Sequence, residues 1–242
     1  MMITRSLSIT ILAASLCLAL PALAQDIIFI APTNHTMPLA QFENGTLSGG
    51  ILKDLGELIA QRMGLHAVFV SIPSRRVSDA LSSGTGDAVC YVLPRWLDGN
   101  FNWTQPVLNN AGLVVARSDA PVIKSLADLA DKPVGTIAGY RYPDIEAVLG
   151  KQFRRDDAPT MDHNFRKLAV GRMQYAVMEQ STYSYHMRTQ PDTKVRADLV
   201  FASFKTQCAF SLKSRVPFEQ AERAIGTLID DGSVQALQAR YR

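Results

Sequence analysis

A regular alternation of strand and helix patterns is the feature that most constrains the fold of this chain. Apolar runs of strand length occupy Ile27–Ala31, His66–Ile72 and Asp87–Val92. Between them, residues 51–63 carry apolar side chains at helical spacing, and a shorter helix is expected over Val77–Leu81. This βαβαβ order predicts an α/β fold built on a mainly parallel, helix-covered sheet.

A second α/β unit follows the first. It begins near Ser125, which together with Asp128 comes close to a capping box at a helix start. Strands are expected at 113–116, 134–138, 175–178, 199–204 and 208–212, and helices at 145–153, 165–170, 182–188 and 218–241. The chain is long enough for one large domain or two small ones, and the pattern predicts two α/β units.

The amino terminus predicts export. Arg5 is the only charge before Asp26, and an apolar stretch over Leu7–Leu20 leads to the small residues that end at Ala24. This arrangement is typical of a signal peptide, here over residues 1–24, with cleavage after Ala24 and a periplasmic location for the mature protein. The apolar stretch is short for a bilayer span. A lipid anchor on Cys17 is not expected, because a bulky leucine precedes that cysteine.

Charge and cysteine content narrow the function classes. The formal net charge is +3, and the charges are interspersed without the basic run of a nucleic-acid surface, so no nucleic-acid partner is predicted. The four histidines lack metal-ligand spacing, and neither a metal nor a cofactor is expected. Cys90 and Cys208 both lie in apolar, strand-like runs. Buried thiols and a disulfide formed in an oxidising compartment are both compatible with that setting.

Five short motifs, in a fixed order, resemble bacterial extracellular solute-binding proteins of family 3. They are Asn44-Gly45 leading to Gly50-Ile51 and Asp54-Leu55, then Gly84-x-Gly86-Asp87, Ser125–Leu129 with Lys132–Gly135, Gly171–Val177, and Asp230–Ser233 before the last helix. Each motif alone is weak, but their order covers nearly the whole mature chain. The resemblance implies a type II periplasmic-binding-protein fold that is divergent from the amino-acid binders.

That resemblance also implies a domain organisation. Two α/β lobes would be joined by two crossing segments, with the second lobe inserted in the first and a solute bound in the cleft between them. The first lobe is expected over residues 26–117 plus 205–242, and the second over 118–204. The crossings, and therefore the hinge, are expected near 115–119 and 201–205.

The family's amino-acid binders clamp the carboxylate of the ligand with an arginine after the third strand, and Arg95 matches that arginine by its distance to Phe101. A guanidinium can meet a carboxylate with two parallel hydrogen bonds, which supports the same role from chemistry alone. A solvated surface arginine is the alternative interpretation. The segment before Arg95 is shorter than in the amino-acid binders and lacks their Ser/Thr contacts.

Further candidates follow strand ends or match family positions. Glu179 stands where the family places the acid that binds an amino group. The remaining candidate ligand contacts are Tyr140, Arg141 and Tyr142 after the strand at 134–138, Thr36 in the first loop, Tyr91 near Arg95, and Arg76 after Pro73. Each of them could instead be a surface or packing residue.

These features predict a monomeric periplasmic protein that is not an enzyme. It would close its lobes on a small, polar, carboxylate-bearing solute, an amino acid or an organic acid, and would deliver it to the membrane permease of an ABC-type importer. One alternative is a ligand-sensing input protein for a membrane receptor. Another is an exported dehydratase of cyclic acids, for which Glu179 would be the candidate acid or base.

Overall fold

The computed structural model describes residues 25–241, so the expected signal peptide lies outside the described residues. The strands are β1 (Asp26–Pro32), β2 (Gln41–Glu43), β3 (Thr46–Gly49), β4 (His66–Ile72), β5 (Ala88–Val92), β6 (Asn102–Trp103), β7 (Leu108–Arg117), β8 (Pro133–Ile137), β9 (Arg154–Ala158), β10 (Tyr175–Glu179) and β11 (Val195–Phe210). The α-helices are α1 (Ile51–Met63), α2 (Val77–Ser83), α3 (Pro143–Leu149), α4 (Met161–Ala169), α5 (Gln180–Thr189), α6 (Phe218–Asp230) and α7 (Ser233–Arg240). Within this part of the chain, no helix combines the length and apolar character needed to cross a membrane.

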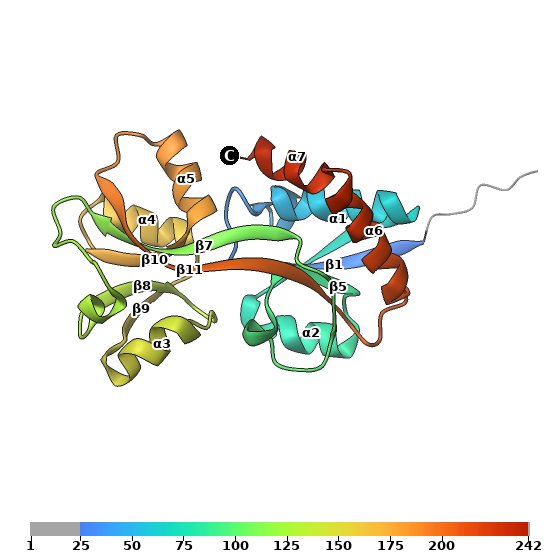
Figure 1. The fold of residues 1–242 in the computed structure, drawn as a ribbon, viewed down its shortest axis with the longest axis horizontal. Helices are drawn as coiled ribbons and strands as arrows, with labels where there is room; N and C mark the ends of the chain where they lie inside the picture. Colours follow the sequence, from blue (N-terminus) through green and yellow to red (C-terminus); the bar gives the residue numbers. More distant parts are fainter. Residues whose placement is uncertain (1–24, 242) are drawn as a thin grey trace, which may run out of the picture.

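One mixed sheet runs through the molecule in the order β4-β1-β5-β11-β7-β10-β8-β9, with β6 also paired to β11. The pairs β1–β4, β1–β5, β8–β10 and β8–β9 are parallel, whereas β11 is antiparallel to both β5 and β7. Two helix-covered units share this sheet (Figure 1). We call the unit around β1, β4 and β5 the first lobe and the unit around β8, β9 and β10 the second lobe.

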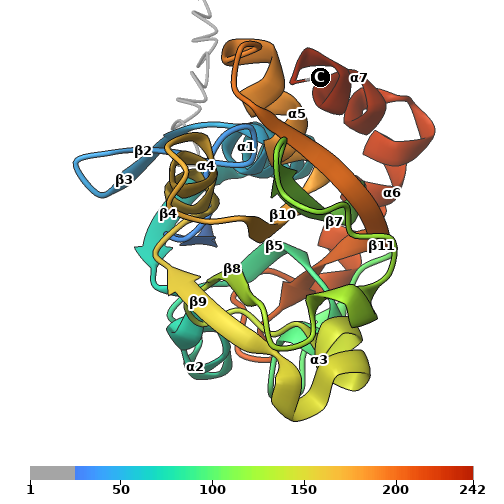
Figure 2. The same cartoon turned by 90° about the vertical axis from the view of Figure 1, so that its left-hand side faces the viewer.

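Each lobe buries its own core on both faces of its strands. In the first lobe, α1, α6 and α7 pack on one face and α2 on the other. In the second lobe, α3 packs on one face, whereas α4 and α5 pack on the other (Figure 2). The predicted α/β fold with two lobes is confirmed, and each lobe has the helix-covered sheet that the apolar patterns indicated.

Local sequence accounts for most element ends. Gly64 and Gly84 end α1 and α2 in the left-handed conformation, with φ of 70° and 80°. Asn44 and Gly45, with φ of 50° and 79°, form the tight turn between β2 and β3. Ser125 makes the capping box expected with Asp128.

The secondary structure differs from the expectation in several places, and two of them concern how the lobes are built. The two strands expected at 199–204 and 208–212 are one long strand, β11, which spans both lobes. The segment Arg154–Ala158 was not expected to be a strand, yet it forms β9 at the edge of the second lobe. Four of its five residues are charged, and charged side chains are common on edge strands because they discourage pairing with other chains.

The two lobes are joined by β7 and β11. Residues 112–116 of β7 already pair with β10 of the second lobe, whereas residues 108–111 pair only with β11. We therefore propose that the crossings lie at 108–111 and 203–206. This moves the first crossing towards the amino terminus from its expected place at 115–119 and leaves the second close to 201–205.

A disulfide between Cys90 of β5 and Cys208 of β11 resolves the question that the sequence left open. The two residues are direct partners across the strand pair, with Cα atoms 3.9 Å apart. The bridge fastens the carboxyl-terminal end of β11 to the first lobe, next to the point where the chain returns from the second lobe.

Removal of this disulfide is expected to destabilise the protein. The double variant Cys90→Ala/Cys208→Ala should lose about 2–5 kcal/mol of unfolding free energy, since the bridge closes a long loop in the unfolded chain. Urea unfolding followed by circular dichroism measures the loss, and wild-type protein unfolded under reducing conditions is the matched control. Equal denaturation midpoints for the oxidised wild type and the double variant would contradict the expectation.

Candidate functional site

A cavity lies between the lobes, at the carboxyl ends of parallel strands from both of them. Its lining includes His35 after β1, Ser74 after β4, Tyr91 at the end of β5, Tyr140 after β8 and Glu179 at the end of β10. The space measures about 910 Å³, including its opening to solvent. Ligands of open α/β sheets bind at the carboxyl ends of strands. The position of this cavity at the strand ends therefore suits a small molecule.

Glu179 is the acidic group deepest in this cavity. It is only 7% exposed, and its Oε2 accepts a hydrogen bond of 2.8 Å from the hydroxyl of Tyr91 in the opposite lobe. Asn110 donates a further hydrogen bond to the same hydroxyl. Burial raises the pKa of Glu179 to about 7, and the bond from Tyr91 offsets only part of that effect. The carboxyl group therefore exchanges its proton near neutral pH.

Aromatic rings form part of the cavity wall. The imidazole of His35 stands edge-on to Tyr91 and Tyr140, with ring centroids 5.6 and 6.0 Å away, and its Nδ1 is 3.1 Å from the Tyr140 hydroxyl. Trp96 stands edge-on to Phe204 at 5.3 Å. Burial lowers the pKa of His35 to about 4, so this ring is neutral at pH 7.

A strand irregularity explains why Tyr91 points into the cavity. Gln207 pairs with Val92 and Cys208 pairs with Cys90, which leaves Tyr91 as an extra residue in β5 without a partner. Its φ is 66°, in the left-handed region that residues other than glycine rarely adopt. Bulges of this kind redirect side chains next to functional sites. The adjacent disulfide and the hydrogen bond to Glu179 both hold Tyr91 in this position.

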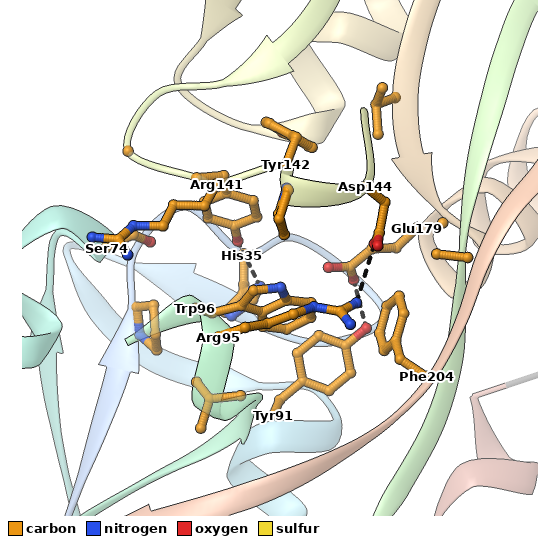
Figure 3. Close-up of a pocket in the computed structure, with 18 of the residues that line it drawn as sticks. His35, Ser74, Tyr91, Arg95, Trp96, Arg141, Tyr142, Asp144, Glu179 and Phe204 are labelled. Carbon is orange, nitrogen blue, oxygen red and sulfur yellow. Dashed lines mark hydrogen bonds and ion pairs between the residues drawn. The ribbon is translucent and has the colours of Figure 1, made fainter. Parts of the chain in front are cut away.

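Two ion pairs span the mouth of the cavity. Arg95 of the first lobe is 3.2 Å from Asp144 of the second, and Arg141 of the second lobe donates two hydrogen bonds to Asp98 of the first, one of them 3.0 Å long. All four side chains are about half exposed or more. Exposed pairs of this kind contribute little individually, about 0–1 kcal/mol. Figure 3 shows Arg95 among the aromatic rings with its ion pair to Asp144, and Arg141 pointing away from the rings.

The structure brings together six of the eight expected ligand contacts. Tyr91, Arg95, Tyr140, Arg141, Tyr142 and Glu179 all line the cavity. Thr36 and Arg76 lie just outside its lining, where their sequence neighbours His35, Ser74 and Val77 stand instead. The Tyr142 hydroxyl accepts a hydrogen bond from the backbone N–H of Ile137, so this side chain also supports the second lobe.

Several lining residues were missed by the sequence interpretation. Trp96, His35, Phe204 and Asp144 line the cavity but were not among the expected ligand contacts. His35 follows β1, so the same strand-end argument that selected Tyr140 could have found it. Phe204 lies on the long strand β11, where the crossing was expected but no contact with the cavity was inferred. Over residues 25–241, no three His, Cys, Asp or Glu side chains are grouped so as to hold a metal ion.

Comparison with known proteins shows which solved structures share this fold. No protein-family model matches the chain, and no curated protein matches it in sequence. Among solved structures, it is similar to an ancestral arginine-binding protein bound to arginine, with a TM-score of 0.76 and 20% identity, over 91% of this chain and 99% of that one.

Two other solved structures are also similar. The arginine-, lysine-, histidine-binding protein ArtJ of Geobacillus stearothermophilus has a TM-score of 0.76 at 16% identity, over 90% of this chain and 95% of that one. A histidine kinase sensor domain with similarity to periplasmic binding proteins has a TM-score of 0.73 at 20% identity, over 90% of this chain and 96% of that one. The fold predicted from the sequence, a two-lobed type II periplasmic-binding-protein fold, is confirmed by these likenesses.

Burial of Glu179 leads to a prediction on stability. The pKa of Glu179 in the folded protein, about 7, lies above the ordinary value of 4.5. Between these two pH values the folded protein therefore binds more protons than the unfolded chain. The unfolding free energy consequently falls as the pH rises through this window. Glu179→Gln removes the buried charge. We expect this variant to be more stable than wild type at pH 8, by about 1–3 kcal/mol.

Urea unfolding at pH 8 and at pH 4.5 measures this difference, which should vanish at the lower pH. Glu219→Gln is the matched control, since Glu219 is exposed on α6. A Glu179→Gln variant that is less stable than wild type at pH 8 would show that the carboxylate is well compensated in the folded protein.

Proposed function

We propose that this protein captures a small polar solute between its two lobes and closes around it. The observation that carries the proposal is the hydrogen bond between Tyr91 of the first lobe and Glu179 of the second, because both lobes contribute to one cavity there. The ion pairs at the mouth and a bond from Asn34 to the carbonyl of Pro159, 3.0 Å long, also form between the lobes. Parting of the lobes would separate the two halves of this cavity and open it further to solvent.

The names of the similar structures support a binding role over catalysis. Two of them are amino-acid-binding proteins and the third is a sensor domain. The sequence favoured a carboxylate-bearing solute held by Arg95. That remains a prediction, and it requires the guanidinium to exchange Asp144 for the carboxylate of the ligand.

Location and partners follow from the same proposal. A protein of this kind works outside the cytoplasm, which agrees with the expected signal peptide, and hands its solute to the permease of an ABC-type importer. The likeness to a histidine kinase sensor domain favours a second candidate, in which the occupied protein signals to a membrane receptor. The neighbouring genes distinguish the two roles, since they would encode either a permease with its ATPase or a signalling protein.

Closure is expected to be visible in solution. A thermal-shift screen of amino acids, organic acids and polyamines should reveal a solute that raises the melting temperature, because the solute binds only the folded protein. Saturation with that solute should reduce the radius of gyration in X-ray scattering, since contacts from both lobes favour the closed state. Tight binding with unchanged scattering would contradict capture by closure.

The ion pairs at the mouth should strengthen binding modestly. Asp144→Asn and Arg95→Gln each remove the same pair from the closed state only, so each should lower affinity by about two- to five-fold. Calorimetry with the solute from the screen measures the change. A much larger loss in the Arg95 variant alone, about 2–5 kcal/mol, would instead show that Arg95 contacts the carboxylate of the solute directly.

A further inference from the structure

We infer that the cavity selects a small organic cation, whose positive group lies against Glu179 among the aromatic rings, and that a carboxylate on the ligand is not required. This inference rests on the proposed function, because it names the class of solute that the same cavity takes. It differs from the sequence expectation, in which the carboxylate of the ligand was the group that the protein recognised.

The first argument is the distribution of charge. The charged side chains of the lining are Arg95, Asp144, Arg141 and Glu179. Both arginines are paired across the mouth, with Asp144 and with Asp98. Glu179 therefore lies inside the cavity without a cationic partner among the described residues. The ring of His35 is neutral and does not balance its charge. An anionic solute placed beside Glu179 would meet repulsion in a poorly solvated space, whereas a cation would be attracted.

The second argument is the chemistry of the walls. The Tyr91 hydroxyl is bonded to Glu179 and Asn110, and the Tyr140 hydroxyl to His35, so these hydroxyls are already used within the protein. What they leave for a solute is ring surface, to which Trp96 and Phe204 add. The faces of aromatic rings are electron-rich and attract ammonium and guanidinium groups. One buried carboxylate inside a set of rings is complementary to an organic cation.

The third argument is the state of Glu179 before binding. A buried carboxylate supported by one tyrosine hydroxyl is poorly compensated, as its raised pKa of about 7 indicates. A cation that enters the cavity supplies the missing partner and favours the ionised form. Binding should therefore strengthen between pH 6 and pH 8 as Glu179 loses its proton. The titratable groups that face the cavity with it are Tyr91, Tyr140, Tyr142 and His35, together with Arg95, Asp144 and Arg141 at the rim.

Matched probes test the inference. Calorimetry at pH 8 would compare agmatine with L-arginine, and phenethylamine with L-phenylalanine and 3-phenylpropionate, with choline as a quaternary ammonium. We expect at least one cationic probe without a carboxylate to bind as tightly as its amino acid or more tightly, and 3-phenylpropionate not to bind. Failure of every cationic probe, or binding of both amino acids more than about ten-fold tighter than their amines, equivalent to 1.4 kcal/mol, would overturn the inference.

Variants connect the probe to the site. Glu179→Gln should weaken binding of the cationic probe by about thirty-fold or more, whereas Glu219→Gln, which is exposed on α6, should leave it unchanged. Trp96→Leu and Phe204→Leu should each weaken it by about two- to ten-fold. A Glu179→Gln protein that keeps its circular dichroism spectrum and its full affinity for the cation would also overturn the inference.

The outcomes separate this inference from the proposed function. An amino acid or organic acid that binds with a smaller radius of gyration, while every carboxylate-free cation fails, would leave capture by closure intact and reject selection of a cation. A cation that binds through Glu179 without any change in scattering would support the selectivity and reject closure.

Discussion

The antiparallel ladder between β7 and β11 is the connection on which the rest of the structure depends. It extends from Val195 paired with Arg117 to Thr206 paired with Leu108, and both sheet halves are built outward from it. Because the carboxyl ends of the parallel strands on both sides face the space between the lobes, residues distant in sequence meet there. The cavity exists because two small sheets share these two strands, and neither lobe encloses it alone.

The cavity concentrates interactions that a stable core would avoid. Glu179 is buried with one hydroxyl donor, Tyr91 has a left-handed backbone, and His35 is buried as a neutral ring. Each arrangement costs folding free energy, and such costs are common where a protein binds or reacts. The two hydrophobic cores and the disulfide between β5 and β11 offset them. These costs are therefore concentrated at the surface between the lobes, where we propose that the solute binds.

Sequence patterns predicted the fold well because they report local burial. The apolar runs of β1, β4 and β5 and the helical spacing of α1 describe which side chains face a core, and that information is local. The charged strand β9 was missed because four of its five residues are charged, so the segment carries no apolar strand pattern. The expected site residues were found by strand ends and by resemblance. The partners of Arg95 and Arg141 could not be found this way, since both ion pairs form between lobes that no local pattern relates.

Position 91 has to meet two requirements that few amino acids satisfy together. The backbone there, with φ of 66°, favours glycine or asparagine, whereas the cavity needs a ring and a hydroxyl that reach Glu179. Replacements should therefore fall into two groups. Some relieve the backbone strain but remove the ring from the cavity wall, and others keep a ring but retain the strain. In a library of all substitutions at position 91, the stability of the protein and its affinity for a solute should consequently vary in opposite directions. Tyrosine would be a compromise between them.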